Sequence, residues 1–65
     1  MSAAERREEL AGDLERIAEE LADLAIDELR DAVRAKGSAR PAAEKQLTQA
    51  RRAVEKAIHL LRQSD

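Results

Sequence analysis

Residues 10–33 read LAGDLERIAEELADLAIDELRDAV, and apolar side chains recur in this stretch at steps of three and four. Such steps place side chains along one face of an α-helix. One stripe consists of Leu10, Leu14, Ile17, Leu21 and Leu24, and a second consists of Ala11, Ala18, Ala22, Ile26, Leu29 and Val33. At about 100° per residue, the two stripes together span roughly 200° of the helix circumference. A single neighbouring helix cannot cover that width, so the sequence predicts that the chain associates with itself.

The composition leaves few other ways to stabilise a fold of 65 residues. The chain has no cysteine and one histidine, which excludes disulfide bonds and thiolate zinc sites. A chain of this length lies near the lower limit at which one core is sufficient, and oligomerisation is a common remedy. Charged residues make up 40% of the chain and aromatic residues are absent, which is typical of a solvated helical bundle. A net charge of only -2 and the helical periodicity argue against disorder.

The cellular location is expected to be cytoplasmic. The N-terminal residues 1–7 lead into charge rather than into the apolar core of a signal peptide. No apolar run is long enough to span a bilayer.

The helix boundaries follow from capping and stop signals. Ser2 and Glu5 have the spacing of a capping box, so a first helix is predicted over about 3–36, with Gly37 as its stop. Gly12 weakens this helix by about 1 kcal/mol relative to alanine. After a turn at 37–40, capped by Ser38 and followed by Pro41, a second helix is predicted over about 40–63.

The second helix carries a coiled-coil pattern. Its predicted seam consists of Ala43, Leu47, Ala50, Val54, Ala57 and Leu61, with Ile58 and Leu60 beside it. A short connection makes the two helices antiparallel neighbours. The first helix is longer, and we expect its residues 2–11 to project beyond the hairpin. Residues 1–36 hold 11 acidic and 6 basic side chains, a balance of -5, whereas residues 37–65 hold 3 and 6, a balance of +3. The opposite charges favour the hairpin.

The predicted fold class is therefore all-α, a single two-helix antiparallel hairpin that dimerises into a four-helix bundle. Its core and dimer interface are predicted to comprise Leu10, Leu14, Ile17, Leu21, Leu24, Ile26, Leu29, Val33, Leu47, Val54, Ile58 and Leu61.

Two sets of acidic side chains are candidate functional groups. A row of four carboxylates at helical spacing is predicted to form a solvated outer face rather than a cation site or a surface for a basic partner. This row comprises Glu20, Asp23, Asp27 and Asp31. Glu15 and Glu28 lie at the edges of the apolar stripes, where a carboxylate can fix register by pairing with an arginine. The favoured interpretation is that both reach out to the rim.

A basic surface on the second helix comprises Lys45, Arg52, Lys56 and His59. A basic helix face of this kind can bind the phosphate backbone of a nucleic acid. The pI of about 5.4, the absence of aromatic residues and the absence of a helix-turn-helix pattern argue against nucleic-acid binding. No activated nucleophile or phosphate-binding loop is present, so we expect no enzyme and no catalytic, cofactor-binding or metal-binding residues.

The stretches ELADLA at 20–25 and ARRAVEKA at 50–57, with the alanine- and arginine-rich composition, resemble short uncharacterised proteins of high-GC bacteria. In architecture the chain also resembles the Rop-type hairpins of plasmid copy control, which pair as antiparallel four-helix bundles. That likeness implies the bundle. The RNA-binding face of those hairpins uses an aromatic residue, which this chain lacks.

The functional expectation is a small protein-interaction module, acting as a scaffold, adaptor or regulator, with itself as the first partner. Two alternatives stay open. The hairpin docks a helix of a different protein, or it binds nucleic acid as a dimer through the basic face of the second helix. A role at a membrane surface is disfavoured, since the polar face of the first helix is acidic and anionic lipid would repel it.

Overall fold

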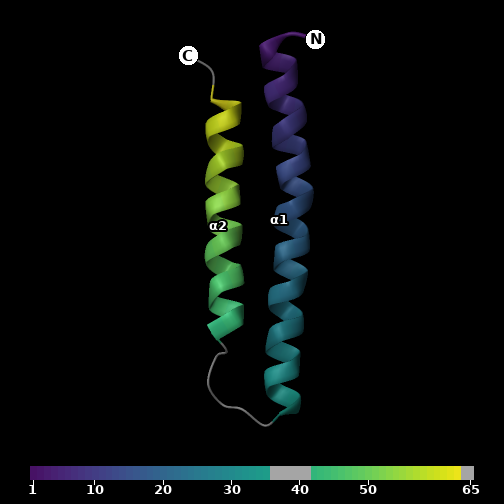
Figure 1. Cartoon of the computed structure of the whole chain (residues 1–65), viewed down its shortest axis with the longest axis vertical. Coiled ribbons are helices and arrows are strands. Elements are labelled where there is room, and N and C mark those ends of the chain that lie inside the picture. The colour runs from purple at the N-terminus through teal and green to yellow at the C-terminus, as the bar shows by residue number, and fades with distance from the viewer. Residues whose placement is uncertain (36–41, 64–65) are drawn as a thin grey trace.

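The structure, a computed structural model, describes residues 1–35 and 42–63. Two helices make up this part of the chain, α1 (Ala3–Arg34) and α2 (Ala42–Arg62), against predicted spans of 3–36 and 40–63. They lie side by side and antiparallel, with the start of α1 and the end of α2 at the same end of the molecule (Figure 1). The all-α hairpin predicted from the sequence is thus present. Neither helix is long and apolar enough to cross a membrane, within the residues described.

The start of α1 confirms the predicted cap. Ser2 is extended, with φ -77° and ψ 163°, and the Glu5 backbone N–H donates to Ser2 Oγ at 3.1 Å. The Ser2 hydroxyl donates in turn to Glu5 Oε1 at 3.1 Å. The first of these bonds satisfies a backbone donor that the first helical turn leaves without a partner, and the second joins the two side chains. The predicted stop at Gly37, the turn at 37–40 and the residues Ser38 and Pro41 lie outside the described residues.

The helices meet along a narrow seam in which α1 contributes small side chains. Ala11 is fully buried and Ala18 is 9% exposed, while Leu14, Leu21 and Ala25 are half-buried. These positions follow one another at steps of three and four, as in a coiled coil. On α2 the half-buried apolar residues of the seam are Leu47, Val54, Ile58 and Leu61, and Ala57 at the edge of the seam is half-buried as well. No large side chain in the described residues is fully buried. A single hairpin therefore has a thin core.

The seam of α2 differs from the predicted one. Ala43 and Ala50 are exposed, and their places in the interface are taken by Glu44, which is 2% exposed, and Arg51, which is half-buried. The positions 44, 47, 51, 54, 58 and 61 also follow steps of three and four, so α2 is rotated by about one position from the expected orientation. Glu44 is held there in part by the Thr48 hydroxyl, which donates to Glu44 Oε1 at 2.8 Å. The hydrocarbon stems of Glu44 and Arg51 thus fill part of the interface, while Ala43 and Ala50 lie at its edge.

The predicted N-terminal overhang of residues 2–11 is too long, because α1 already contacts α2 at Arg7. Arg7 reaches the end of α2, where its guanidinium donates to the carbonyls of Leu60 and Gln63 at 3.4 Å each. At the other end of the hairpin, Glu44 in the first turn of α2 lines the same hollow as Leu29. The extra length of α1 is therefore divided between its two ends, as Figure 1 shows. The expectation failed because it assumed a connection too short to let α2 begin beside Leu29.

Candidate self-association surface

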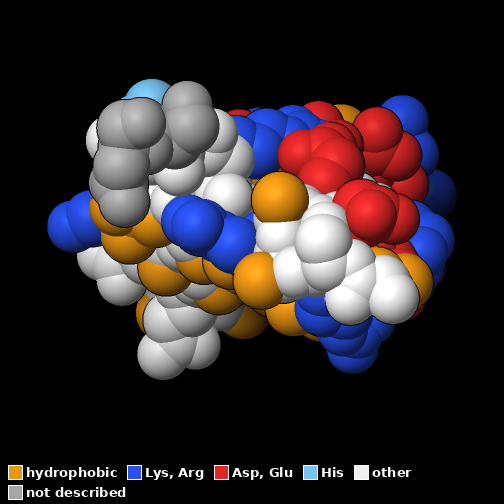
Figure 2. Space-filling model, turned by 90° about the horizontal axis from the view of Figure 1, so that it is seen from above, with side chains coloured by type: hydrophobic (Ala, Val, Ile, Leu, Met, Phe, Trp, Pro, Cys, Tyr) orange, Lys and Arg blue, Asp and Glu red, His pale blue; other side chains and the backbone are white. Residues whose placement is uncertain are grey.

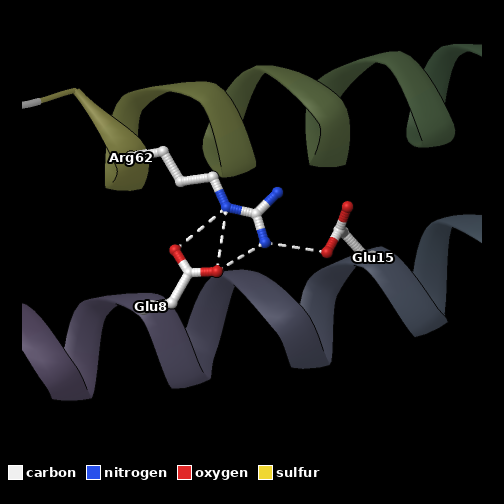
Figure 3. A network of polar contacts seen from close by, with 3 residues as sticks. All are labelled: Glu8, Glu15 and Arg62. Atoms are coloured by element: carbon white, nitrogen blue, oxygen red, sulfur yellow. Dashed lines mark hydrogen bonds and ion pairs between the residues drawn. The ribbon is translucent and has the colours of Figure 1, made fainter.

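One edge of the seam is polar and is built around Arg62. The Arg62 guanidinium Nη2 lies 2.8 Å from Glu8 Oε1 and 2.8 Å from Glu15 Oε1, and Arg62 Nε lies 3.0 Å from Glu8 Oε2 (Figure 3). Hydrogen bonds from Arg62 hold the pKa of Glu8 and of Glu15 below their ordinary value of 4.5. The two carboxylates likewise raise the pKa of Arg62 above its ordinary value. This bridge joins the end of α2 to the N-terminal half of α1.

The polar edge continues along the hairpin. Glu15, Glu19, Arg51 and Glu55 line an open hollow between the helices, with Ala18, Ala22 and Ile58 as its floor. The Glu15 prediction is thereby refined, because this carboxylate stands at the rim, half exposed, and pairs with an arginine of the other helix. Glu28 is half-buried on α1. The bridge was not foreseen, although the signal was present, since Glu8 and Glu15 are seven positions apart and so share one face of the helix.

The opposite edge of the seam is apolar. On α1 it carries Leu10, Ile17 and Leu24, which are 37%, 39% and 50% exposed and recur every seven residues. On α2 the alanines 43, 50 and 57 recur at the same interval, on the side of the seam away from Arg62. Leu60, 50% exposed, lies on the same side. We call this surface the leucine face, and it comprises Leu10, Ile17, Leu24, Ala43, Ala50, Ala57 and Leu60.

The view along the helices shows the same asymmetry. Hydrophobic side chains run along the lower edge of Figure 2, from the α2 side toward the middle of the molecule, and acidic side chains gather at the upper right, over α1. The hairpin therefore does not present equal surfaces on its two sides.

A second apolar patch lies near the C-terminal end of α1. Ile26, Leu29 and Val33 are 46%, 39% and 72% exposed, and together with Arg30 and Arg34 they line a shallow hollow. We call Ile26, Leu29 and Val33 the Ile26 patch. Ile26 follows Leu24 by two positions, which is about 200° around the helix. The Ile26 patch and the leucine face thus point in different directions.

The residues predicted as core and interface fall into three groups. Six lie half-buried in the seam between the helices: Leu14, Leu21, Leu47, Val54, Ile58 and Leu61. Leu10, Ile17 and Leu24 belong to the leucine face, and the remaining three form the Ile26 patch. The chain folded on itself thus leaves half of the predicted apolar set exposed.

The acidic row of α1 faces solvent. Glu20, Asp23, Asp27 and Asp31 are all exposed, and two of them pair with arginines of the same helix, Asp27 with Arg30 at 4.0 Å and Asp31 with Arg34 at 3.6 Å. Among the described residues no group of three or more histidine or acidic side chains is arranged to hold a metal ion.

The basic residues of α2 are exposed on its outer side. Lys45 and Arg52 line a shallow hollow with Thr48 and Gln49, and Lys56 and His59 continue the surface toward the C-terminal end. His59 Nε2 lies 3.4 Å from Gln63 Nε2. The arrangement is an exposed helix face with a shallow hollow near its Lys45 end.

Comparisons of this chain with protein-family models, with curated proteins and with solved structures found no match.

Proposed function

We propose that this chain is a small homo-oligomeric protein-interaction module without catalytic activity, a scaffold, adaptor or regulator. In this proposal two hairpins pack leucine face to leucine face and form a four-helix bundle. The observation that carries the proposal is the leucine face itself, where large apolar side chains recur every seven residues along the edge of an existing coiled-coil seam.

The energetics support a partner on this face. Burying a leucine or isoleucine side chain completely stabilises a protein by about 1.5–3 kcal/mol relative to full exposure. Leu24 and Leu60 each retain half of their exposure in the hairpin, so covering them contributes on the order of 1 kcal/mol per side chain. A two-fold dimer covers every such side chain twice. The thin core of the single hairpin makes this gain necessary rather than incidental.

The position of the charged groups supports the same face. The polar edge carries Arg62 and its two carboxylates together with Arg51 and Glu55, which would have to be desolvated if a partner covered them. The leucine face carries only apolar members. A second hairpin therefore loses least by packing on the leucine face.

A second candidate function is favoured by the Ile26 patch, which would stay uncovered in such a dimer. Its shallow apolar hollow between Arg30 and Arg34 suits the apolar side of an acidic amphipathic helix from a different protein. In that case the dimer acts as a scaffold, and the Ile26 patch is the surface that binds the helix of the partner protein.

A matched pair of substitutions tests the proposal. Leu24 and Ile26 are similar in size and in exposure, 50% and 46%, but only Leu24 belongs to the leucine face. The absolute mass of the wild type, Leu24→Gln and Ile26→Gln is measured by light scattering over a concentration series. The expected mass is twice 7.2 kDa for the wild type and for Ile26→Gln, with a shift toward 7.2 kDa for Leu24→Gln. A wild type that stays at 7.2 kDa at every concentration, or a mass that falls only in Ile26→Gln, would overturn the proposal.

A further inference from the structure

The two halves of the leucine face differ in side-chain size. The α1 half carries Leu10, Ile17 and Leu24, and the α2 half carries an alanine at each of the corresponding positions 43, 50 and 57, with Leu60 as its one large side chain, at the C-terminal end. A surface with one large and one small half constrains how a second copy can be placed on it. This constraint rests on the proposed dimer and determines the relative direction of its two hairpins.

Two arrangements with two-fold symmetry bring a pair of leucine faces together. With the symmetry axis parallel to the helices, α1 packs on the partner's α2 and the two α1 helices run in the same direction. With the axis perpendicular to the helices, α1 packs on the partner's α1 and the two run in opposite directions. We call these the same-end and the opposite-end arrangement, after the ends at which the two copies of Arg34 lie.

Side-chain size favours the same-end arrangement. It sets the large side chains of α1 against the partner's alanines on both sides of the bundle, so the two layers interdigitate at an even spacing. The opposite-end arrangement sets leucine and isoleucine against one another along one side and alanine against alanine along the other. On the alanine side the helix axes would have to approach to the short end of the usual distance of about 8–10 Å, while on the leucine side they would stay further apart. The space between the two hairpins would then be wedge-shaped.

Charge favours the same arrangement. Between Ala3 and Arg34, α1 holds 11 acidic and 5 basic side chains, a balance of -6, and between Ala42 and Arg62, α2 holds 2 and 5, a balance of +3. Three of the acidic residues, Asp13, Glu20 and Asp27, each follow a large residue of the leucine face by three positions and so border it. The opposite-end arrangement brings these acidic borders of the two α1 helices together. The same-end arrangement instead sets each of them beside the border of the partner's α2, where the equivalent residues Gln46, Ala53 and Leu60 are uncharged.

We propose that two copies of this chain pack in the same-end arrangement, with α1 of each on α2 of the other and both copies of Arg34 at one end of the bundle. The leucine face of one copy is thus covered by the leucine face of the other, and the large side chains of each α1 pack on the alanines of the partner's α2.

Distances between spin labels test this proposal. The chain has no cysteine, so Ala35→Cys and Ala4→Cys each provide one label site per copy. Both residues are exposed and lie at opposite ends of α1. Their separation along the helix is roughly 47 Å at a rise of about 1.5 Å per residue. The labelled variants are measured by double electron–electron resonance, and their masses are measured in the same buffer.

The same-end arrangement predicts short distances for both label sites, roughly 15–25 Å, since the two α1 helices are diagonal neighbours in the bundle. Distances of roughly 40–55 Å at both sites would overturn the proposal in favour of the opposite-end arrangement, with the dimer intact. Absence of a dipolar signal together with a mass of 7.2 kDa would overturn the proposed dimer as well. The mass measurement therefore separates failure of the geometry from failure of the proposed function.

Discussion

Replacing Gly12 with alanine is expected to stabilise the protein, and the size of the effect follows from the structure. Gly12 lies inside α1, and a Cβ added there meets no atom within 4 Å beyond its chain neighbours and the adjacent backbone of α1. The substitution therefore neither gains nor loses packing, and what remains is helix propensity, which favours alanine over glycine by about 0.8–1.0 kcal/mol. Gly12 follows Leu10 by two positions, about 200° around the helix, so a partner on the leucine face does not reach it.

The expected change in melting temperature is about 7 °C. An unfolding entropy near 2.1 cal/mol/K per residue amounts to roughly 0.14 kcal/mol/K for a chain of 65 residues, and the gain of about 1 kcal/mol is divided by this value. In a dimer both the gain and the entropy double, so the shift is the same whichever species melts. The assay is thermal unfolding followed by circular dichroism at 222 nm, at equal chain concentrations.

Gly12→Leu provides the control for this reasoning. Leucine has nearly the helix propensity of alanine, so in open space it gives a similar increase in melting temperature. An increase with alanine but a decrease with leucine would mean that another chain packs close to Gly12. A decrease in melting temperature with both substitutions would refute the argument that the low helix propensity of glycine lowers the stability of α1 at this position.

Three further predictions concern the ends and the seam of the hairpin. Ala11→Leu should lower stability by about 1–3 kcal/mol in urea unfolding, because Ala11 is fully buried and the seam has no room for the larger side chain; an unchanged midpoint would show that the helices separate there freely. Ser2→Ala should cost about 1 kcal/mol and reduce protection of the first amides of α1 from hydrogen exchange, since the Glu5 N–H loses its acceptor; equal protection in both proteins would contradict the capping role. Below about pH 5 the melting temperature of the wild type should fall more steeply than that of Arg62→Gln, because the pKa of Glu8 and of Glu15 is lowered in the folded state, so their contribution is present above the unfolded value of 4.5 and is lost as the pH falls through the folded values. Parallel pH profiles for the two proteins would show that the bridge to Arg62 does not persist in solution.

The hairpin and its first cap could be predicted because they depend on local signals. Steps of three and four specify helices, and Ser2 with Glu5 specifies where α1 begins. The position of α2 around its own axis could not be predicted in the same way. Two sets of positions with the same spacing share Leu47, Val54 and Leu61, and they differ only in whether alanines or the larger residues Glu44, Arg51 and Ile58 complete the seam. A periodicity analysis assigns only apolar residues to the seam. In the folded hairpin the hydrocarbon stems of long polar side chains also pack there.

The polar edge and the leucine face depend on that orientation. Arg62 meets Glu8 and Glu15 only because α2 turns its Arg62 side toward the same edge as these carboxylates. The same rotation moves Ala43 and Ala50 out of the seam and places them beside Leu10, Ile17 and Leu24. The sequence indicated that α1 has more apolar surface than one helix can cover, and the structure shows which part of that surface stays exposed.

Isoleucine methyl groups offer the most direct test of the central claim, that a second copy covers the leucine face. The chain has three isoleucines, Ile17 on the leucine face, Ile26 in the Ile26 patch and Ile58 in the seam. In a sample that mixes methyl-labelled and unlabelled chains, isotope-filtered nuclear Overhauser spectra report only contacts between copies. The account predicts intermolecular cross-peaks from the Ile17 δ1 methyl and none from that of Ile26. Cross-peaks from Ile26 alone, or from neither methyl, would contradict it.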